Sequence, residues 1–242
     1  MNYKPTYQHF GENGVLINWP SKIDSLVNDE VLHFDAFIGE VFGSKIIELV
    51  PSYQSLAVYL KEGESVHNFI QLLKELSASE TTKPQNVRRL ITIPVCYDLK
   101  YALDIEELAL ANKIAVKKVI ELHTKEIYKV YFLGFLPGFP YLGGLNKALY
   151  TPRKSTPRIN IEKGSVAIGG EQTGIYTTDS PGGWNVIGRS PLTFFSCESS
   201  LKCLLKPGDF VKFSSISKEK FKKIESEVMQ GTFEVEKEDR ND

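Results

Sequence analysis

Cysteine is scarce in this sequence, and the three cysteines present indicate neither a disulfide framework nor a metal site. They are Cys96, Cys197 and Cys203. Their number is odd, they form no C-x-x-C pair, and no histidine lies near any of them in the sequence. Because thiols of cytoplasmic proteins rarely pair, we expect reduced, partly buried side chains, with a catalytic cysteine as the minor alternative.

Long apolar runs and an excess of one charge are also missing. No window approaches about 18 apolar residues, and the first residues, MNYKPTYQHFGENG, lack the apolar segment of a signal peptide. The sequence has 29 Lys and Arg against 30 Asp and Glu, a net charge of −1, which gives no general attraction to nucleic acid or to an anionic membrane. We therefore expect a cytoplasmic protein that binds neither.

Short motifs of several enzyme classes are absent as well. The sequence has no G-x-x-x-x-G-K-[ST] phosphate loop, no H-E-x-x-H, no zinc-ligand spacing and no G-x-S-x-G. Its Gly-Gly pairs open no obvious helix after a strand, so a dinucleotide site is not indicated. These absences argue against a self-contained metallohydrolase or serine hydrolase, and we expect no metal site.

Apolar spacing and turn signals divide the chain into two lobes and a tail. Residues 1–85 are predicted to form a small α+β sandwich of order ββαββα, with both helices on one sheet face. The strands are expected at 7–10, 15–19, 46–50 and 55–60, with a hairpin turn at 11–14, and the helices at 21–42 and 64–76. The polar segment 77–86 is the expected linker.

Residues 86–230 are predicted to form a β-rich lobe, followed by a charged, frayed tail at 231–242. A strand is expected at 87–95, and a helix capped by Asp104 in a capping box with Glu107. Helical turns should continue to Leu122 with a break near Ala115. Final strands are expected at 201–205 and 209–213, and a polar helix at 217–229.

Glycine and proline are concentrated in one block of the second lobe. Eleven of the 18 glycines and six of the 12 prolines lie between Gly134 and Pro191. Such a density predicts tight turns and close backbone approaches, with the intervening aromatic and β-branched residues in short strands of a barrel. We interpret this block as the functional site and the rest of the chain as its support.

Three arginines of the block are candidate anion ligands. Arg153 and Arg158 belong to the doubled T-P-R of T-P-R-K-S-T-P-R, and Arg189 follows Gly188. Because proline fixes φ, each of the first two sits on a stiffened backbone and loses little freedom on binding a carboxylate or phosphate. The alternative is a pair of solvated surface arginines.

The glycines and polar residues that follow leave two interpretations open. Backbone N–H groups near Gly164, Gly169 and Gly170 could face an anion, or these glycines could turn a barrel corner. A small amide or ring could be bound by the run Gln172-Thr173-Gly174-Ile175-Tyr176. Alternatively, Tyr176 could be a barrel residue whose hydroxyl is solvated. Trp184 is expected in the core or in a pocket wall.

His123 is the candidate acid or base, because it is the histidine closest to the block in sequence. It is expected at the end of a helix, where the helix dipole tends to raise a histidine's pKa. A plain helix cap is the alternative.

Taken in order, these motifs make the sequence resemble the allophanate hydrolase subunit 1 family. The second lobe carries the strong likeness, and the first lobe matches mainly in layout. The matching motifs are L-H-T at 122–124, G-F-L-P-G-F-P-Y-L at 134–142, T-P-R at 151–153 and 156–158, G-S-V at 164–166, Q-T-G-I-Y at 172–176, P-G-G-W at 181–184 and I-G-R at 187–189.

The resemblance implies a fold and an activity. Family members have a small α+β N-terminal lobe followed by a cyclophilin-like β-barrel lobe. The family contains one component of the bacterial ATP-dependent 5-oxoprolinase, which opens the lactam of 5-oxo-L-proline to L-glutamate. It therefore implies ATP as co-substrate, with Mg²⁺ bound in the complex. It also implies the sister 5-oxoprolinase subunits as partners, the C-type component most directly and the A-type component as well.

The same resemblance assigns expected roles within the block. It implies a catalytic group of His123, Arg158 and Gln172. Substrate or phosphate would be bound by Arg153, Arg189, Gly170, Thr173 and Tyr176. The pocket wall would be formed by Phe135, Pro137, Phe139 and Trp184.

Three other functions stay open. The family also includes an inhibitor of a sporulation sensor histidine kinase, so a regulatory protein with a kinase partner is one alternative. A protein that hydrolyses allophanate or another carboxamide, beside an amidase or biotin-dependent carboxylase, is a second. A binding module with an inactive pocket is the third.

Overall fold

The structure, a computed structural model, describes residues 4–20, 24–76, 88–198 and 202–240. Contacts within the chain separate two compact units, Met1–Asn86 and Val87–Asp242, next to the boundary expected from the sequence. The predicted linker at 77–86 lies outside the described residues.

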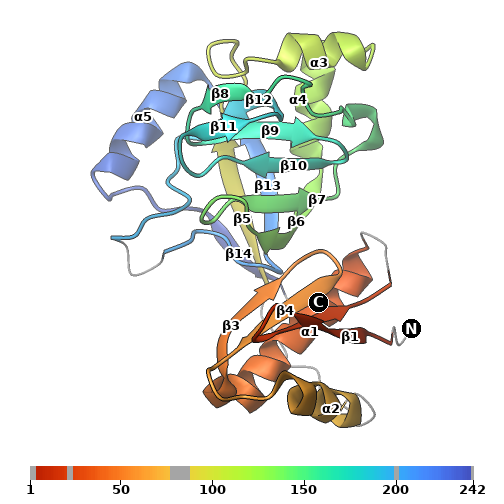
Figure 1. Ribbon diagram of the computed structural model, residues 1–242. Helices are drawn as coiled ribbons and strands as arrows, with labels where there is room; N and C mark the ends of the chain where they lie inside the picture. Colours follow the sequence, from red (N-terminus) through yellow and green to blue (C-terminus); the bar gives the residue numbers. More distant parts are fainter. Residues whose placement is uncertain (1–3, 21–23, 77–87, 199–201, 241–242) are drawn as a thin grey trace. The chain divides into compact units, whose positions relative to one another are not determined.

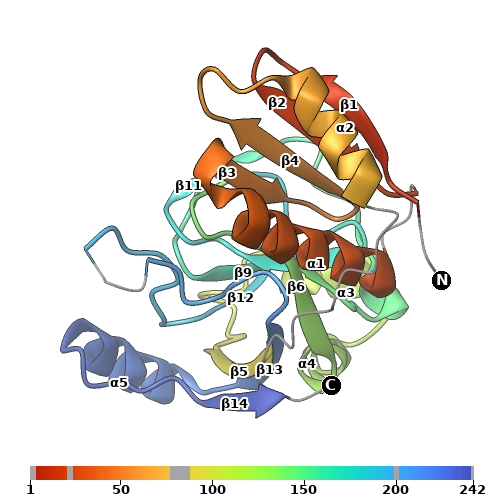
Figure 2. The same ribbon diagram turned by 90° about the horizontal axis from the view of Figure 1, so that it is seen from below.

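The first unit is a four-stranded antiparallel sheet with two helices on one face (Figures 1 and 2). Its elements follow the expected order: β1 (Thr6–Phe10), β2 (Gly14–Asn18), α1 (Ser25–Phe42), β3 (Ile46–Pro51), β4 (Ser55–Leu60) and α2 (Val66–Leu76), with a short 3₁₀ turn at Gly43–Lys45. The strand order is β1-β2-β4-β3. Alternate residues of β2 and β4, such as Ile17 and Val58, are fully buried under both helices in one apolar core.

The second unit is built on an eight-stranded mixed sheet of order β12-β9-β10-β7-β6-β13-β5-β14 (Figure 1). Its strands are β5 (Arg88–Val95), β6 (Ile127–Leu133), β7 (Pro140–Gly143), β9 (Ser165–Gly169), β10 (Gln172–Ile175), β12 (Asn185–Arg189), β13 (Phe210–Ser215) and β14 (Lys237–Arg240). A separate two-stranded sheet pairs β8 (Arg158–Ile161) with β11 (Ser180–Gly182). The helices are α3 (Ile105–Ala111), α4 (Val116–Lys125) and α5 (Lys218–Met229), with a 3₁₀ turn at Lys147–Leu149.

This sheet curls but does not close into the expected barrel. The edge strand β12 meets the chain after β5 at a single bridge, in which the Cys96 and Arg189 backbones exchange hydrogen bonds of 2.8 and 3.0 Å. One edge of β5 pairs in parallel with β13 along Leu90–Val95, and the other pairs antiparallel with β14 along Arg88–Ile91, while β12 meets this chain only at Cys96, just beyond the end of β5. Gly188 allows this approach, because a Cβ there would lie 2.7 Å from a methyl carbon of Val95.

Two expectations near the C-terminus are wrong in detail. Residues 237–240 of the charged tail form β14, which pairs with β5, and the Arg240 guanidinium lies 4.8 Å from the centre of the Phe210 ring. In place of a strand at 201–205, the described residues show one bridge between Cys203 and Phe195. No helix among the described residues has the length and apolar character needed to cross a bilayer.

The two faces of the large sheet differ, and this difference places the site. Thr173 and Ile175 of β10 point to the inner face, which carries the main buried core and α4. Gln172 and Gly174 alternate with them and point to the outer face.

Candidate functional site

The glycines of the block make room for aromatic rings on the outer face of the sheet. Several strand glycines lie directly under a ring, so that a Cβ would collide with it, and Gly143, Gly169 and Gly174 are three of them. The distances from a built Cβ to the nearest ring atom are 1.8 Å for Gly143 under Tyr131, 2.5 Å for Gly169 under Trp184 and 2.8 Å for Gly174 under Phe139. The block therefore owes much of its glycine content to ring packing against strands.

Two of these rings, Phe139 and Trp184, belong to an aromatic cluster that also contains Tyr141 and Tyr176. The rings meet edge to face, with centroids 5.0–5.9 Å apart. Phe139, Tyr176 and Trp184 are buried, whereas Tyr141 is half-buried. Burial raises the pKa of Tyr176, partly offset by a hydrogen bond from the Trp184 backbone N–H. Tyr176, expected to bind substrate, thus has its phenol inside the cluster.

Arg153 lies over this cluster. Its guanidinium carbon is 5.6 Å from the centre of the Trp184 ring, and its charge acts on Tyr141 and Tyr176. The residue is exposed, and among the described residues no carboxylate forms an ion pair with it.

The backbone on both sides of Arg153 is fixed by hydrogen bonds. The Lys154 N–H donates to the Gly183 carbonyl at 2.7 Å, and the Asn185 amide donates to the Pro152 carbonyl at 2.9 Å. One residue earlier, the N–H of Gly170 donates to the Thr151 carbonyl at 2.7 Å. The arginine is therefore presented by a rigid segment, to which these bonds contribute beside the prolines.

Arg158 is held by a buried carboxylate. Two of its nitrogens donate to the two oxygens of Asp104, each at 2.7 Å. Lys154 lies 2.9 Å from the same carboxylate, and the Val186 N–H donates to it at 2.7 Å. Asp104 occupies the N-cap position of α3 but makes no capping bond, so the predicted capping box is wrong: the carboxylate is turned toward Arg158, Lys154 and Val186 instead.

Arg189 is also engaged. Its guanidinium pairs with the exposed Glu162 and donates to the Lys163 carbonyl at 3.0 Å. It also lies 5.9 Å from the Tyr101 ring and 6.0 Å from the Phe221 ring. Of the three candidate arginines, Arg153 alone has its guanidinium directed to the aromatic cluster without a described carboxylate partner.

His123 is fully buried on the inner face, within a chain of hydrogen bonds. Its Nδ1 lies 2.7 Å from the Tyr97 hydroxyl and its Nε2 lies 3.0 Å from the Thr173 hydroxyl. The Thr173 hydroxyl donates to the Ala167 carbonyl at 3.0 Å, so it accepts from Nε2–H, and Nδ1 accepts from Tyr97. All three side chains are satisfied with the imidazole neutral.

Burial lowers the pKa of His123 to about 3, so the expected rise from the helix end does not occur. The ring stacks on Phe213 with centroids 4.5 Å apart, and the surrounding core excludes the water that would solvate an imidazolium. Thr173 lies beside it on the same face, 0% exposed. Neither residue meets the aromatic cluster across the sheet.

The remaining candidates are divided between the outer face and the loops. Gln172 is half-buried and pairs in register with Gly169, the glycine under Trp184. Phe135 is 64% exposed and has φ of 67°, and Pro137 is exposed on the same turn. The expected backbone donors at Gly164 and Gly170 are used, because their N–H groups donate to the Tyr176 and Thr151 carbonyls.

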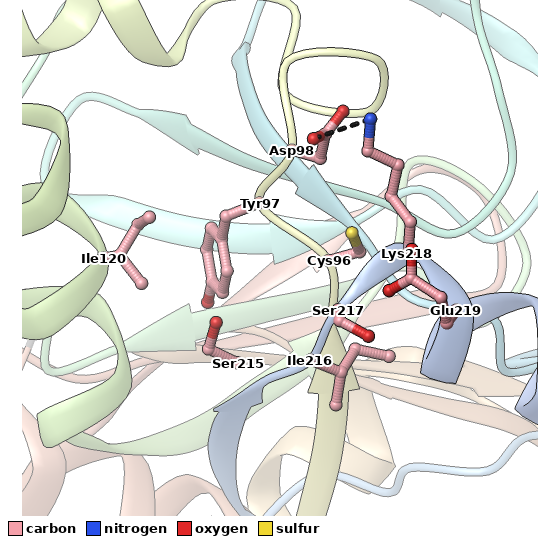
Figure 3. Close-up of a pocket in the computed structure, with 9 residues that line it drawn as sticks. All are labelled: Cys96, Tyr97, Asp98, Ile120, Ser215, Ile216, Ser217, Lys218 and Glu219. Atoms are coloured by element: carbon pink, nitrogen blue, oxygen red, sulfur yellow. Dashed lines mark ion pairs between the residues drawn. The ribbon is translucent and has the colours of Figure 1, made fainter.

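A pocket of about 400 Å³ lies elsewhere in the second unit (Figure 3). An Asp98–Lys218 ion pair of 2.9 Å borders it, and Tyr97 and Ile120 form another part of its wall. It contains none of the residues expected from the sequence. Two of its lining residues bond to them: the Tyr97 hydroxyl to His123, and the Cys96 backbone to that of Arg189.

The side chains of the block do not fit a bound nucleotide. Two of the three arginines are neutralised by Asp104 and Glu162, and the glycine N–H groups named above already have acceptors. Within the described ranges, no group of three or more His, Cys, Asp or Glu side chains could hold a metal ion.

Sequence reasoning missed two residues that organise this region, Asp104 and Tyr97. The sequence around Asp104 predicts a helix cap, because nothing in it reveals a partner 54 residues away. No pattern marked Tyr97.

Comparison with known proteins places the chain among named relatives. Residues 5–205 match the family model described as carboxyltransferase domain, subdomain C and D. The chain is 37% identical to the 5-oxoprolinase B subunit of Bacillus subtilis (strain 168) over 232 residues, which are 91% of this chain and 97% of that protein. It is 40% identical to the 5-oxoprolinase B subunit of Escherichia coli O157:H7 over 170 residues, 69% of this chain and 77% of that protein.

A solved structure has the same fold. The crystal structure of TTHA0988 in space group P212121 superposes with a TM-score of 0.74 and 32% identity over 84% of this chain. This chain spans 40% of that longer chain.

Proposed function

The chain belongs to the carboxyltransferase domain, subdomain C and D, family, and we propose that it is one of the subunits of a 5-oxoprolinase. The predicted relationship to the allophanate hydrolase subunit 1 family is confirmed by these matches. The observation that carries the proposal is the 37% identity to the 5-oxoprolinase B subunit of Bacillus subtilis across 97% of that protein's length.

The proposed reaction is the ATP-dependent opening of the lactam of 5-oxo-L-proline to L-glutamate. A lactam is resonance-stabilised and a poor electrophile, so its carbonyl carbon must be activated before water attacks. Because the described donor groups do not fit a nucleotide, we assign the ATP and Mg²⁺ site to the partner proteins. Activity would then require the complex, with the C-type and A-type components of 5-oxoprolinase as the expected partners. A cytoplasmic location is part of the proposal, because ATP is available there.

In this proposal the chain contributes a binding surface for the substrate. Arg153 binds the substrate carboxylate, since it is a fixed cation without a described carboxylate partner. The half-buried Tyr141 and Gln172 lie on the same outer face and offer a hydroxyl and an amide to the lactam. The Trp184 ring forms the floor beneath them, and the exposed turn of Phe135 and Pro137 forms a rim.

The residues expected to be catalytic take other tasks in this proposal. His123 supports β10 from the inner face as a neutral hydrogen-bonding group, because burial lowers its pKa to about 3. Arg158 secures the segment that carries Arg153 through its pair with Asp104. Gln172 remains in the site as a substrate ligand.

The direct test measures ATP-dependent glutamate release from 5-oxo-L-proline. The purified chain would be assayed alone and then with its C-type and A-type partners, with and without ATP. We expect release only with the partners and with ATP. Absence of activity in every combination of folded proteins would reject the proposal, and inhibition of a histidine kinase would then be assayed with the same preparation.

A further inference from the structure

The Asp104 carboxylate is the most heavily bonded side chain near the proposed site. Its side chain is 1% exposed, and it accepts from Arg158, Lys154 and the Val186 N–H. Burial alone would raise the pKa of Asp104, but these three donors outweigh it and hold the pKa below its usual value. The carboxylate therefore remains charged in the folded protein.

Its donors come from the two segments that meet at the proposed site. Lys154 and Arg158 belong to the segment that carries Arg153, and the Lys154 N–H is bound to the Gly183 carbonyl. Val186 is two residues after Trp184, and its carbonyl accepts from the Asp104 N–H at 2.8 Å. One carboxylate thus ties the arginine segment to the strand that follows the tryptophan.

The position of Asp104 also shows what the carboxylate does not do. It stands at the N-cap of α3, where an aspartate commonly accepts from helix N–H groups. Here it makes no such bond and reaches across to the arginine segment instead. Burying a carboxylate costs free energy unless both of its oxygens are hydrogen-bonded. We therefore infer that the buried Asp104 carboxylate has a role that depends on its bonds to the arginine segment.

We propose that Asp104 is a positioning residue that holds the Arg153 guanidinium over Trp184 and so sets the affinity of the site for the carboxylate of 5-oxo-L-proline. The identity of the substrate in this inference rests on the proposed function. The contacts of Asp104 with the arginine segment do not depend on it. Asp104 acts through Lys154 and Arg158 and does not itself touch the substrate. Its loss therefore weakens substrate binding by releasing Arg153.

The first experiment measures KM and kcat of the assembled enzyme with Asp104→Asn. Without the Asp104 carboxylate, Arg153 should bind the substrate carboxylate more weakly, and this interaction is the same in the ground state and the transition state. KM should therefore rise about tenfold, while kcat changes less than about threefold. In the double variant, adding Asp104→Asn to Arg153→Ala should change KM by less than about twofold relative to Arg153→Ala alone. An equal effect of Asp104→Asn with and without Arg153 would overturn the inference.

The matched control is Glu162→Gln, which removes the exposed carboxylate paired with Arg189 elsewhere in the block. It should leave KM within about twofold of the parent, because exposed ion pairs contribute little. If Asp104→Asn does not fold by circular dichroism, Lys154→Met takes its place. It removes one of the donors to Asp104 and should raise KM about threefold, again only when Arg153 is present.

A second readout does not depend on the reaction. The chain has two tryptophans, so Trp19→Phe leaves Trp184 as the sole indole reporter. Acrylamide quenching of Trp184 should increase about twofold in Asp104→Asn and in Arg153→Ala, with no further increase in the double variant. Unchanged quenching in Asp104→Asn would overturn the inference even in an active enzyme. An enzyme inactive on 5-oxo-L-proline, with quenching changed as expected, would instead reject the proposed function and keep Asp104 as the positioning residue.

Discussion

The two faces of β10 use polar residues in opposite ways. On the inner face, Thr173 and His123 are 0% exposed, and each hydrogen-bonding group has a partner inside the protein. On the outer face, Arg153 is exposed above Trp184, and its backbone, not its guanidinium, is held by hydrogen bonds. Residues next to each other in sequence, such as Gln172 and Thr173, are thereby separated into different environments.

This difference indicates where function and stability are located. A buried group whose partners are all within the core contributes to the free energy of folding, and it has no capacity left for a ligand. An exposed cation on a fixed backbone contributes little to folding but is ready to bind an anion. Changes on the inner face should therefore alter stability, and changes on the outer face should alter activity.

The largest loss of stability is expected from His123→Ala. It would open a cavity beside Phe213 and leave the Tyr97 and Thr173 hydroxyls without their partner, costing about 4 kcal/mol of unfolding free energy. Urea titration measures the loss, and His67→Ala on the exposed side of α2 is the control. A loss below about 1 kcal/mol would show that the inner face is not the stabilising one.

A smaller loss is expected when the wild-type protein is acidified. The pKa of His123 is lowered from 6.5 to about 3 by burial, so below pH 6.5 the unfolded state binds a proton that the folded state refuses. The free energy of unfolding should then fall by roughly 2 kcal/mol between pH 6.5 and 4.5 through this group.

A comparison with His123→Gln isolates this contribution. Burial raises the pKa of Asp35 to about 6, which has the opposite sign: its contribution increases stability as pH falls through that value. Asp35 is present in both proteins, so it cancels in the difference between their pH profiles. Parallel profiles from pH 6.5 to 4.5 would contradict the assignment of His123 as a buried neutral group.

Gly169→Ala tests the outer face by displacing the Trp184 ring. The added Cβ would lie 2.5 Å from the Trp184 ring, so the ring must shift, at a cost of about 1–2 kcal/mol. Trp184 fluorescence in a Trp19→Phe background should change as well. Gly43→Ala, where φ is −53° and no atom lies within 4 Å of the added Cβ, is the matched control and should be neutral or slightly stabilising.

Local pattern predicted much of the fold, and long-range pairing accounts for most of the errors. The hairpin of β1 and β2 and the amphipathic helices were predictable because turn residues and apolar spacing are local signals. Strand β14, with the sequence K-E-D-R, was not, because its order comes from pairing with β5. The prediction of a closed barrel failed for the same reason, since the pairing of β5 with β13 and β14 is not visible in the sequence.

The site in the glycine-rich block stays a prediction, and the contacts of its residues could not be predicted from the sequence. Within the block, the structure brings the Arg153 guanidinium to 5.6 Å from the centre of the Trp184 ring. However, residue type does not reveal that the other two arginines, Arg158 and Arg189, form ion pairs with Asp104 and Glu162. Nor does it reveal that His123 points to the inner face, because a helix end can be buried or exposed with the same local sequence.

Arg153→Ala should have the smallest effect on stability and a large effect on activity. The arginine has no described ion pair, and its contact with Trp184 is worth about 0.5–1 kcal/mol at an exposed site, so urea titration should show only a small loss. Loss of the substrate carboxylate's partner should raise KM of the assembled enzyme by roughly tenfold or more. Arg153→Lys retains the charge but not the planar guanidinium and should recover only part of the affinity. If Arg153→Ala were instead unstable with normal KM, the outer face would be as structural as the inner one, and the site would have to be sought elsewhere on this unit.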